Sequence, residues 1–165
     1  MKASPPEIVC LGILVADVIA RPVDALPDRG TLTLVDALGL RGGGGALTTS
    51  TWLARSGVSV AAAGKVGADA FGDFILGLLE ERGVDRAGVL RDELAPTSAS
   101  IVLVDAAGER TFLHLPGANG ALRADELDPE LLYAGRWLLI TVLAARSMPN
   151  GFSPSRCFPA ASTAQ

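Results

Sequence analysis

The sequence predicts an α/β fold in which a mostly parallel, Rossmann-like sheet is flanked by helices. Short apolar runs of strand length alternate along the chain with longer segments whose apolar residues have a helical spacing. Apolar residues make up 49% of the 165 residues and aromatic residues only 5%, so the core is expected to consist mainly of Ala, Val, Leu and Ile. Such a core suits parallel strands that are buried on both faces.

At this length the chain is expected to hold one domain, covering residues 1–145. Residues 146–165 differ from the rest, because they are rich in Ser, Pro and Ala and show no periodicity. A segment of that composition buries too little apolar surface to offset the entropy lost on ordering. We therefore expect residues 146–165 to be a disordered tail.

The first expected strand covers residues 7–13 (EIVCLGI), a short run of branched apolar side chains. Proline, aspartate and glycine favour turns between residues 22 and 30. Residues 31–40 partly alternate polar and apolar side chains, as a half-exposed strand does. Residues 42–45 are consecutive glycines, each costing about 1 kcal/mol relative to Ala inside a helix. They are expected to form a loop that lets the backbone approach a ligand or another strand closely.

The next segments read as a helix, a strand and a second helix. Residues 47–55 are expected to be helical and to end at Gly57, and residues 58–66 are strand-like. Residues 69–82 carry the clearest helical pattern, with Asp69 and Asp73 interpreted as helix-start residues rather than a catalytic pair. One apolar stripe on this helix is expected to pack in the core: Phe71, Phe74, Ile75, Leu78 and Leu79.

Two further strands are expected at residues 98–104 and 111–115, joined by a loop of hairpin composition. Residues 127–134 form a short expected helix, with Asp125 and Glu126 near its positive end. Residues 136–143 are another candidate for a buried strand.

Charge and composition exclude several functions. The net charge is −4 and the arginines are scattered, which argues against a nucleic-acid-binding surface. Cys10 and Cys157 lie far apart, and the single His114 has no partners at metal-ligand spacing, so neither a disulfide nor a metal site is expected. The apolar segment at residues 137–145 falls well short of the roughly 20 residues that span a bilayer. A soluble, cytoplasmic protein without membrane contact is expected.

The glycine run does not match the common nucleotide-binding motifs. A Walker A loop needs a Lys-Ser/Thr pair after its second conserved glycine, and none follows residues 42–45. The dinucleotide pattern G-x-G-x-x-G fails because Leu47 stands where its third glycine would be. P-loop NTPases and Rossmann dehydrogenases are therefore disfavoured. From the residues alone, a turn without any ligand is about as probable as a binding loop.

A set of short segments, in order and at suitable spacing, resembles the ribokinase-like (PfkB) family of carbohydrate and nucleoside kinases. The segments are Gly12-Ile13-Leu14-Val15-Ala16-Asp17, Gly43-Gly44 with Thr48 and Ser50, Gly64-x-x-Gly67-x-Asp69-x-Phe71-Gly72, Pro96-Thr97 with the hairpin after it, and Gly117-Ala118-Asn119. The resemblance covers most of residues 7–134. It implies that the domain is partial, with the C-terminal half of the family's fold missing.

The resemblance also implies a small β-sheet lid, at roughly residues 13–36 and 97–115, over a sugar site. The implied substrate-binding residues are Asp17, Gly43, Gly44, Thr48 and Asn119. Asp17 matches the acidic residue that hydrogen-bonds sugar hydroxyls, and a carboxylate can accept from two neighbouring hydroxyls. Without the resemblance, a solvated residue at a turn or strand end is the alternative interpretation of Asp17.

Two positions depart from the family's pattern. Thr48 stands where an amide side chain is usual, and Val15 stands where members often carry another polar ligand. Either the substrate differs from ribose or sugar binding has decayed. The family's second signature, Gly-x-Gly-Asp, supplies the catalytic base and faces the phosphates, and it is absent from this sequence. No catalytic residue is therefore assigned, and binding of Mg-ATP, the cofactor of the complete family, is in doubt for this chain.

Two hypotheses follow from these observations. In the first, the chain keeps the sugar- or nucleoside-binding half of an ATP-dependent carbohydrate kinase and shows no appreciable turnover alone. In the second, it is a non-catalytic sugar-binding or dimerising remnant of a truncated gene. The resemblance implies that such a homodimer would form through the lid, where exposed strand edges invite pairing.

Overall fold

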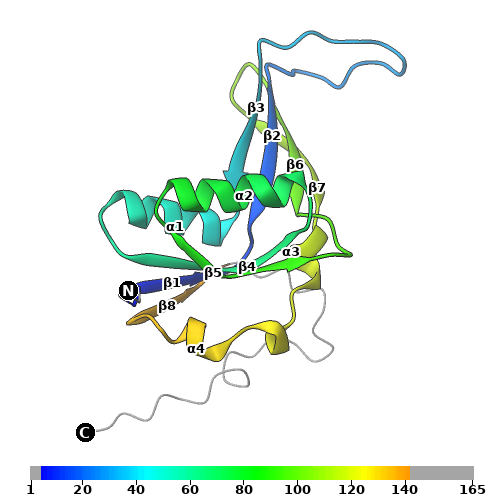
Figure 1. Cartoon of the computed structure of the whole chain (residues 1–165). Coiled ribbons are helices and arrows are strands. Elements are labelled where there is room, and N and C mark those ends of the chain that lie inside the picture. The colour runs from blue at the N-terminus through cyan, green and yellow to red at the C-terminus, as the bar shows by residue number, and fades with distance from the viewer. Residues whose placement is uncertain (1–4, 142–165) are drawn as a thin grey trace, which may run out of the picture.

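The computed structural model describes residues 5–141, which form an α/β body and a second sheet that projects from it (Figure 1). The body contains a fully parallel sheet in the order β5-β4-β1-β8. Its strands are β1 (Ile8–Leu11), β4 (Val60–Gly67), β5 (Asp85–Asp92) and β8 (Trp137–Ile140). The predicted α/β class with a parallel sheet is therefore confirmed.

The second sheet, called the lid sheet from here on, has the order β3-β2-β6-β7. Its strands are β2 (Val15–Arg21), β3 (Ala37–Gly43), β6 (Ala99–Val104) and β7 (Arg110–Leu115). Strands β2 and β6 run parallel, whereas β3 and β7 pair antiparallel with their neighbours. Figure 1 shows the lid sheet rising from the body, with the loop between β2 and β3 extending beyond its tip.

Helices cover both faces of the body sheet (Figure 1). On one face lie α1 (Gly45–Arg55) and α2 (Ala70–Glu81), and on the other lies the short helix α4 (Pro129–Leu132). Successive side chains of β1 and β4 point to opposite faces. Cys10 and Ala62 therefore enter the core beneath α1 and α2, whereas Val9 and Leu11 join the smaller core beside α4. Burial on both faces explains why β1 and residues 60–63 of β4 are continuous apolar runs.

Helix α2 begins and ends much as its sequence predicts. The Asp69 carboxylate accepts a hydrogen bond from the Gly72 N–H, which is the expected cap, and Gly83 follows the helix with φ 71°. Ile75 and Leu79 are fully buried at the centre of the apolar stripe. The capping role predicted for Asp69 is confirmed.

Two expectations for residues 31–45 are wrong, and one strand further along was not predicted. Residues 31–36 form no strand, and β3 begins only at Ala37. The glycine run is not a separate loop, because Gly42 and Gly43 pair with β2 and α1 starts at Gly45. Only Gly44 between them has a positive φ, 87°. Strand β5 has no counterpart among the expected elements, because its sequence DRAGVLRD lacks the alternation of apolar and polar residues that predicts a strand. It lies at an exposed edge of the body sheet.

The second half of the chain needs one correction. The helix expected at residues 127–134 shrinks to Pro129–Leu132 and is capped by Asp128. Asp125 and Glu126 do not lie at its start, because they belong to a preceding 3-10 turn, η1 (Ala124–Glu126). The tail expected at residues 146–165 and the end of the expected strand at 136–143 lie outside the described residues. Among the helices of residues 5–141, none is long and apolar enough to cross a membrane.

A hydrogen-bond network centred on Asp69 attaches the lid sheet to the body. The Thr97 hydroxyl donates to Asp69 Oδ1 at 2.6 Å, and the Thr97 N–H donates to Oδ2 at 2.8 Å. The same hydroxyl accepts from the N–H of Gly67 at 2.8 Å. Thr97 lies just before β6, and Gly67 ends β4, so one carboxylate fixes the start of α2, the end of β4 and the root of the lid.

Burial alone would raise the pKa of Asp69, but the hydrogen bonds from Thr97 and from the backbone at the start of α2 outweigh it. The pKa is therefore held below its usual value. A carboxylate with a lowered folded pKa stabilises the fold above its unfolded pKa of about 3.9. That contribution is lost as the pH falls through the folded value.

Replacing Gly67 by Ala tests how closely the lid root approaches β4. An added Cβ would lie 2.5 Å from the Thr97 nitrogen and 2.7 Å from the Ala95 oxygen, both backbone atoms. We expect urea unfolding to show a loss of about 1–3 kcal/mol from overpacking. Gly77→Ala is the control, because nothing lies within 4 Å of its added methyl group inside α2. It should leave stability unchanged or raise it by up to about 1 kcal/mol, and equal stabilities of the two variants would contradict the close approach.

Asp69→Ala tests the anchoring carboxylate. At pH 7 we expect a loss of about 1–2 kcal/mol, because the variant loses the helix cap and leaves Thr97 without its acceptor. The difference from the wild type should begin to shrink as the pH falls below the unfolded pKa of about 3.9, and it should be lost as the pH falls through the lowered folded pKa. Asp73→Ala is the control in the same helix turn, where only an exposed ion pair to Arg91 is lost, worth at most about 1 kcal/mol. A stability difference for Asp69→Ala that did not change with pH would contradict the assigned role.

Candidate functional site

The candidate site lies where the lid sheet meets the body, around the carboxylate of Asp17. Asp17 is half-buried on β2, and its side chain lies over Gly43 on the neighbouring strand. A Cβ on Gly43 would collide with Asp17 Oδ2, so the glycine makes the room that the carboxylate occupies. Within residues 5–141 no group donates a hydrogen bond to this carboxylate, although its position is shielded. Both carboxylate oxygens of Asp17 are thus available to accept hydrogen bonds from a ligand.

Gly44 sets the approach of α1 to this site. Its φ of 87° is unfavourable for other residues, and a Cβ there would collide with the carbonyl of Ile13. The Ile13 carbonyl accepts a hydrogen bond from the Ala46 N–H at 3.2 Å. The first turn of α1 therefore packs directly on the connection between β1 and β2, a few residues before Asp17. Both predicted glycines, Gly43 and Gly44, line the same junction.

Asn119 hydrogen-bonds the backbone of the same connection between β1 and β2. It is buried in α3 (Gly117–Ala121), its Oδ1 accepts from the Leu14 N–H at 3.2 Å, and its Nδ2 donates to the Leu14 carbonyl at 2.9 Å. Its own N–H donates to Ser98 Oγ at 3.3 Å. The carboxamide thus holds the backbone of Leu14 just before β2. Asn119 positions the strand that carries Asp17.

Thr48 occupies a different environment. It is exposed in the first turn of α1, and its hydroxyl makes no hydrogen bond within the described part of the chain. The structure therefore brings Asp17, Gly43 and Gly44 together and places Asn119 behind them. Thr48 is exposed to solvent, and no hydrogen bond within residues 5–141 joins its hydroxyl to Asp17.

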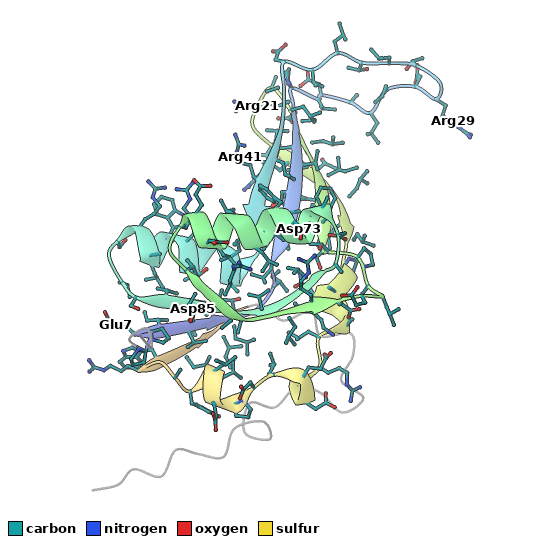
Figure 2. The ribbon with its side chains drawn as sticks, in the orientation of Figure 1. Glu7, Arg21, Arg29, Arg41, Asp73 and Asp85 are labelled. Atoms are coloured by element: carbon teal, nitrogen blue, oxygen red, sulfur yellow. The ribbon has the colours of Figure 1, made fainter. Side chains whose placement is uncertain are left out.

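A row of polar residues crosses the lid sheet at the level of Asp17. Arg41 of β3 and Ser100 of β6 are its direct neighbours, and His114 of β7 is the neighbour of Ser100. Ser100 Oγ lies 3.1 Å from His114 Nδ1. Figure 2 shows the Arg41 side chain leaving β3 near the base of the lid. Sequence reasoning missed this row, because it depends on the register of four strands rather than on any local motif.

A buried ion cluster lies beside the site, at the carboxyl end of β4. Lys65 Nζ is 3.0 Å from Asp92 and 2.5 Å from Glu126, and its side chain is only 7% exposed. Burial by itself lowers the pKa of Lys65, but the two carboxylates more than offset this, so the pKa is raised. Backbone N–H groups of Ala95 and Leu94, together with Lys65, lower the pKa of Asp92 to about 2. The cluster joins β4, the end of β5 and η1.

Within residues 5–141, neither the Cys10 thiol nor a cluster of metal-ligand side chains forms a site. Burial raises the pKa of the Cys10 thiol to about 11, so it is a core residue and a poor nucleophile. Within residues 5–141 there is no group of three or more His, Cys, Asp or Glu residues that could hold a metal ion.

Comparisons with known proteins give the family. The family model described as pfkB family carbohydrate kinase matches residues 5–153. The probable fructokinase-3 of Arabidopsis thaliana is 35% identical over 118 residues, covering 69% of this chain and 34% of that protein. The chain thus spans about a third of the length of this relative.

Two solved structures share the fold. Fructokinase from Xylella fastidiosa has a TM-score of 0.66 at 29% identity, covering 81% of this chain and 40% of that chain. Arabidopsis thaliana ribokinase complexed with ribose and ATP has a TM-score of 0.72 at 23% identity, covering 82% and 45%. The predicted family resemblance is confirmed over most of the sequence. This chain belongs to the pfkB family of carbohydrate kinases.

Proposed function

We propose that the junction around Asp17 binds a sugar, as the substrate-binding part of a kinase that phosphorylates a sugar hydroxyl with ATP. The observation that carries the proposal is the half-buried Asp17 carboxylate, which has room beside Gly43 and no hydrogen-bond donor of its own among residues 5–141. A carboxylate in this state can accept from two adjacent hydroxyl groups of a sugar ring.

The surroundings support this role. Asn119 and Gly44 fix the backbone on either side of the Ile13–Leu14 connection, so Asp17 stands on a rigid strand. Ser100 and His114 offer further hydrogen-bonding groups at the same level of the lid sheet. Relatives named as fructokinases make fructose the first sugar to test, with ribose as the second.

In this role the residues around Asp17 bind the sugar, and none of them is assigned a phosphoryl-transfer step. The sequence has no Gly-x-Gly-Asp segment. Residues 5–141 hold no group of three or more His, Cys, Asp or Glu residues that could hold a metal ion, and none of them is assigned to Mg-ATP or as a base for the sugar hydroxyl.

A thermal-shift experiment with fructose and ribose tests the sugar site. A ligand that binds only the folded state adds about 2.7 kcal/mol of stability at a hundredfold excess over Kd. We expect a sugar-dependent rise in Tm for the wild type and none for Asp17→Ala. Asp36→Ala is the control, since Asp36 is exposed just before β3 and should leave the shift intact. A rise in Tm that survived Asp17→Ala, or no rise with either sugar, would refute the assignment.

A second candidate is homodimerisation through the lid sheet. One face of this sheet carries large exposed apolar side chains, and the register places them opposite the face of Asp17. They are Leu38, Ile101, Leu113 and Leu115, whose exposed fractions are 71%, 47%, 54% and 49%. A second copy meeting this face through the same residues would remove them from water.

Sedimentation of the purified chain tests the dimer. We expect a dimer for the wild type and a monomer for Leu113→Glu, because a charge on the apolar face opposes its burial. Phe112→Glu is the matched control, since Phe112 is similarly exposed, at 52%, but lies on the other face of the same strand. A monomeric wild type, or equal dissociation by both substitutions, would rule out this interface.

A further inference from the structure

A groove on the outer side of the lid root is separate from the sugar site proposed above. It lies between β3, α1 and α2 and has a volume of about 500 Å³. Its lining includes neither Asp17 nor the glycines beside it, Gly43 and Gly44. Three arginines and three large apolar side chains define what we call the arginine groove: Arg41, Arg55, Arg82, Trp52, Phe74 and Leu78.

The arginines of this groove differ from several others in the described chain. Arg86, Arg91 and Arg123 each form an ion pair with a carboxylate at 3.0 Å or less. In contrast, neither Arg41 nor Arg55 has an acidic partner within residues 5–141. Arg41 donates one hydrogen bond to the carbonyl of Leu40, and the Arg55 guanidinium lies 4.9 Å from the centre of the Trp52 ring.

The guanidinium of Arg82 is nearly as available to a ligand as those of Arg41 and Arg55. Arg82 reaches only its neighbour Glu81, at 4.0 Å, and both side chains are well exposed. A guanidinium has five N–H donors, so these contacts leave most of the donors of the groove unused. In a chain of net charge −4, three such groups around one depression form a local positive site. The chemistry favours an anion, and the fork of a guanidinium matches the oxygens of a phosphate.

The floor of the groove favours an organic molecule rather than a bare ion. Trp52 is 61% exposed, and Phe74 and Leu78 are half-buried beside it. The volume falls within the roughly 300–1,000 Å³ typical of small-molecule sites. Apolar floor, cationic rim and size together suit a ring that carries a phosphate.

We propose that the arginine groove binds a phosphorylated small molecule, a nucleoside monophosphate or a sugar phosphate. Its phosphate contacts Arg41 from the lid and Arg55 and Arg82 from the body, and its ring rests on Trp52 and Phe74. The ligand therefore connects the edge strand of the lid sheet to the two helices beneath it. This site is independent of sugar binding at Asp17.

Calorimetric titration at constant ionic strength tests the proposal. The probes are adenosine monophosphate and glucose 6-phosphate, with adenosine and glucose as their uncharged counterparts. At least one phosphorylated probe should bind the groove, and an uncharged probe should show no binding that depends on Arg55 or Arg82. Loss of a hydrogen-bonded charge should weaken binding about tenfold or more in Arg55→Gln and in Arg82→Gln. Which phosphorylated probe binds more tightly identifies the class of ligand.

Two control variants distinguish binding in the groove from attraction by net charge and from binding at Asp17. Arg29→Gln removes the same charge from the tip of the loop between β2 and β3, far from the groove (Figure 2), and should bind like the wild type. Asp17→Ala should also bind like the wild type, whether or not sugar binds at Asp17. Equal weakening by Arg29→Gln would indicate attraction by net charge alone, and loss in Asp17→Ala would place the phosphate in the sugar site. Either result, or no binding of either phosphorylated probe, would overturn the proposal.

Discussion

The carboxylate of Asp69 makes the contacts on which the arrangement of lid and body depends. It caps α2, accepts both the N–H and the hydroxyl of Thr97, and through that hydroxyl reaches the end of β4. The glycines beside it are required by the same closeness, because side chains at Gly67 and Gly72 would meet backbone atoms. These polar contacts fix the root of the lid sheet, and Ala16 and Leu40 add apolar packing against α1 and α2. Elsewhere on the lid sheet, β6 and β7 leave large apolar side chains exposed.

Local patterns in the sequence predicted the body of the fold well. The apolar run of β1 and the stripe and cap of α2 are properties of neighbouring residues, and both elements lie close to their expected bounds. Strand β5 and the start of β3 could not be predicted in this way. Their residues are held in strands by pairing with β4 and β2, and that pairing outweighs weak local preference.

The candidate site was predicted in part, for a similar reason. Asp17 and Gly43 could be named from short segments, because the family resemblance preserves their spacing. The role of Asn119 could not be foreseen from its own surroundings, since its partner Leu14 lies more than a hundred residues earlier. The ion cluster around Lys65 and the three arginines of the outer groove also come from distant segments. Side chains brought together by the sheet order leave no local signal.

Strand β1 pairs with two strands that come much later in the chain. Ile8 lies beside Val60 on one side and beside Trp137 on the other. During synthesis from the N-terminus, the first strand therefore leaves the ribosome with both edges unpaired. Its first neighbour follows after two lid strands and a helix, and its second only after every other strand of the described chain has been made. Such distant pairing slows folding and leaves an apolar segment open to other chains meanwhile. The order of the body sheet thus leaves β1 in need of protection while the strands that pair with it are being made.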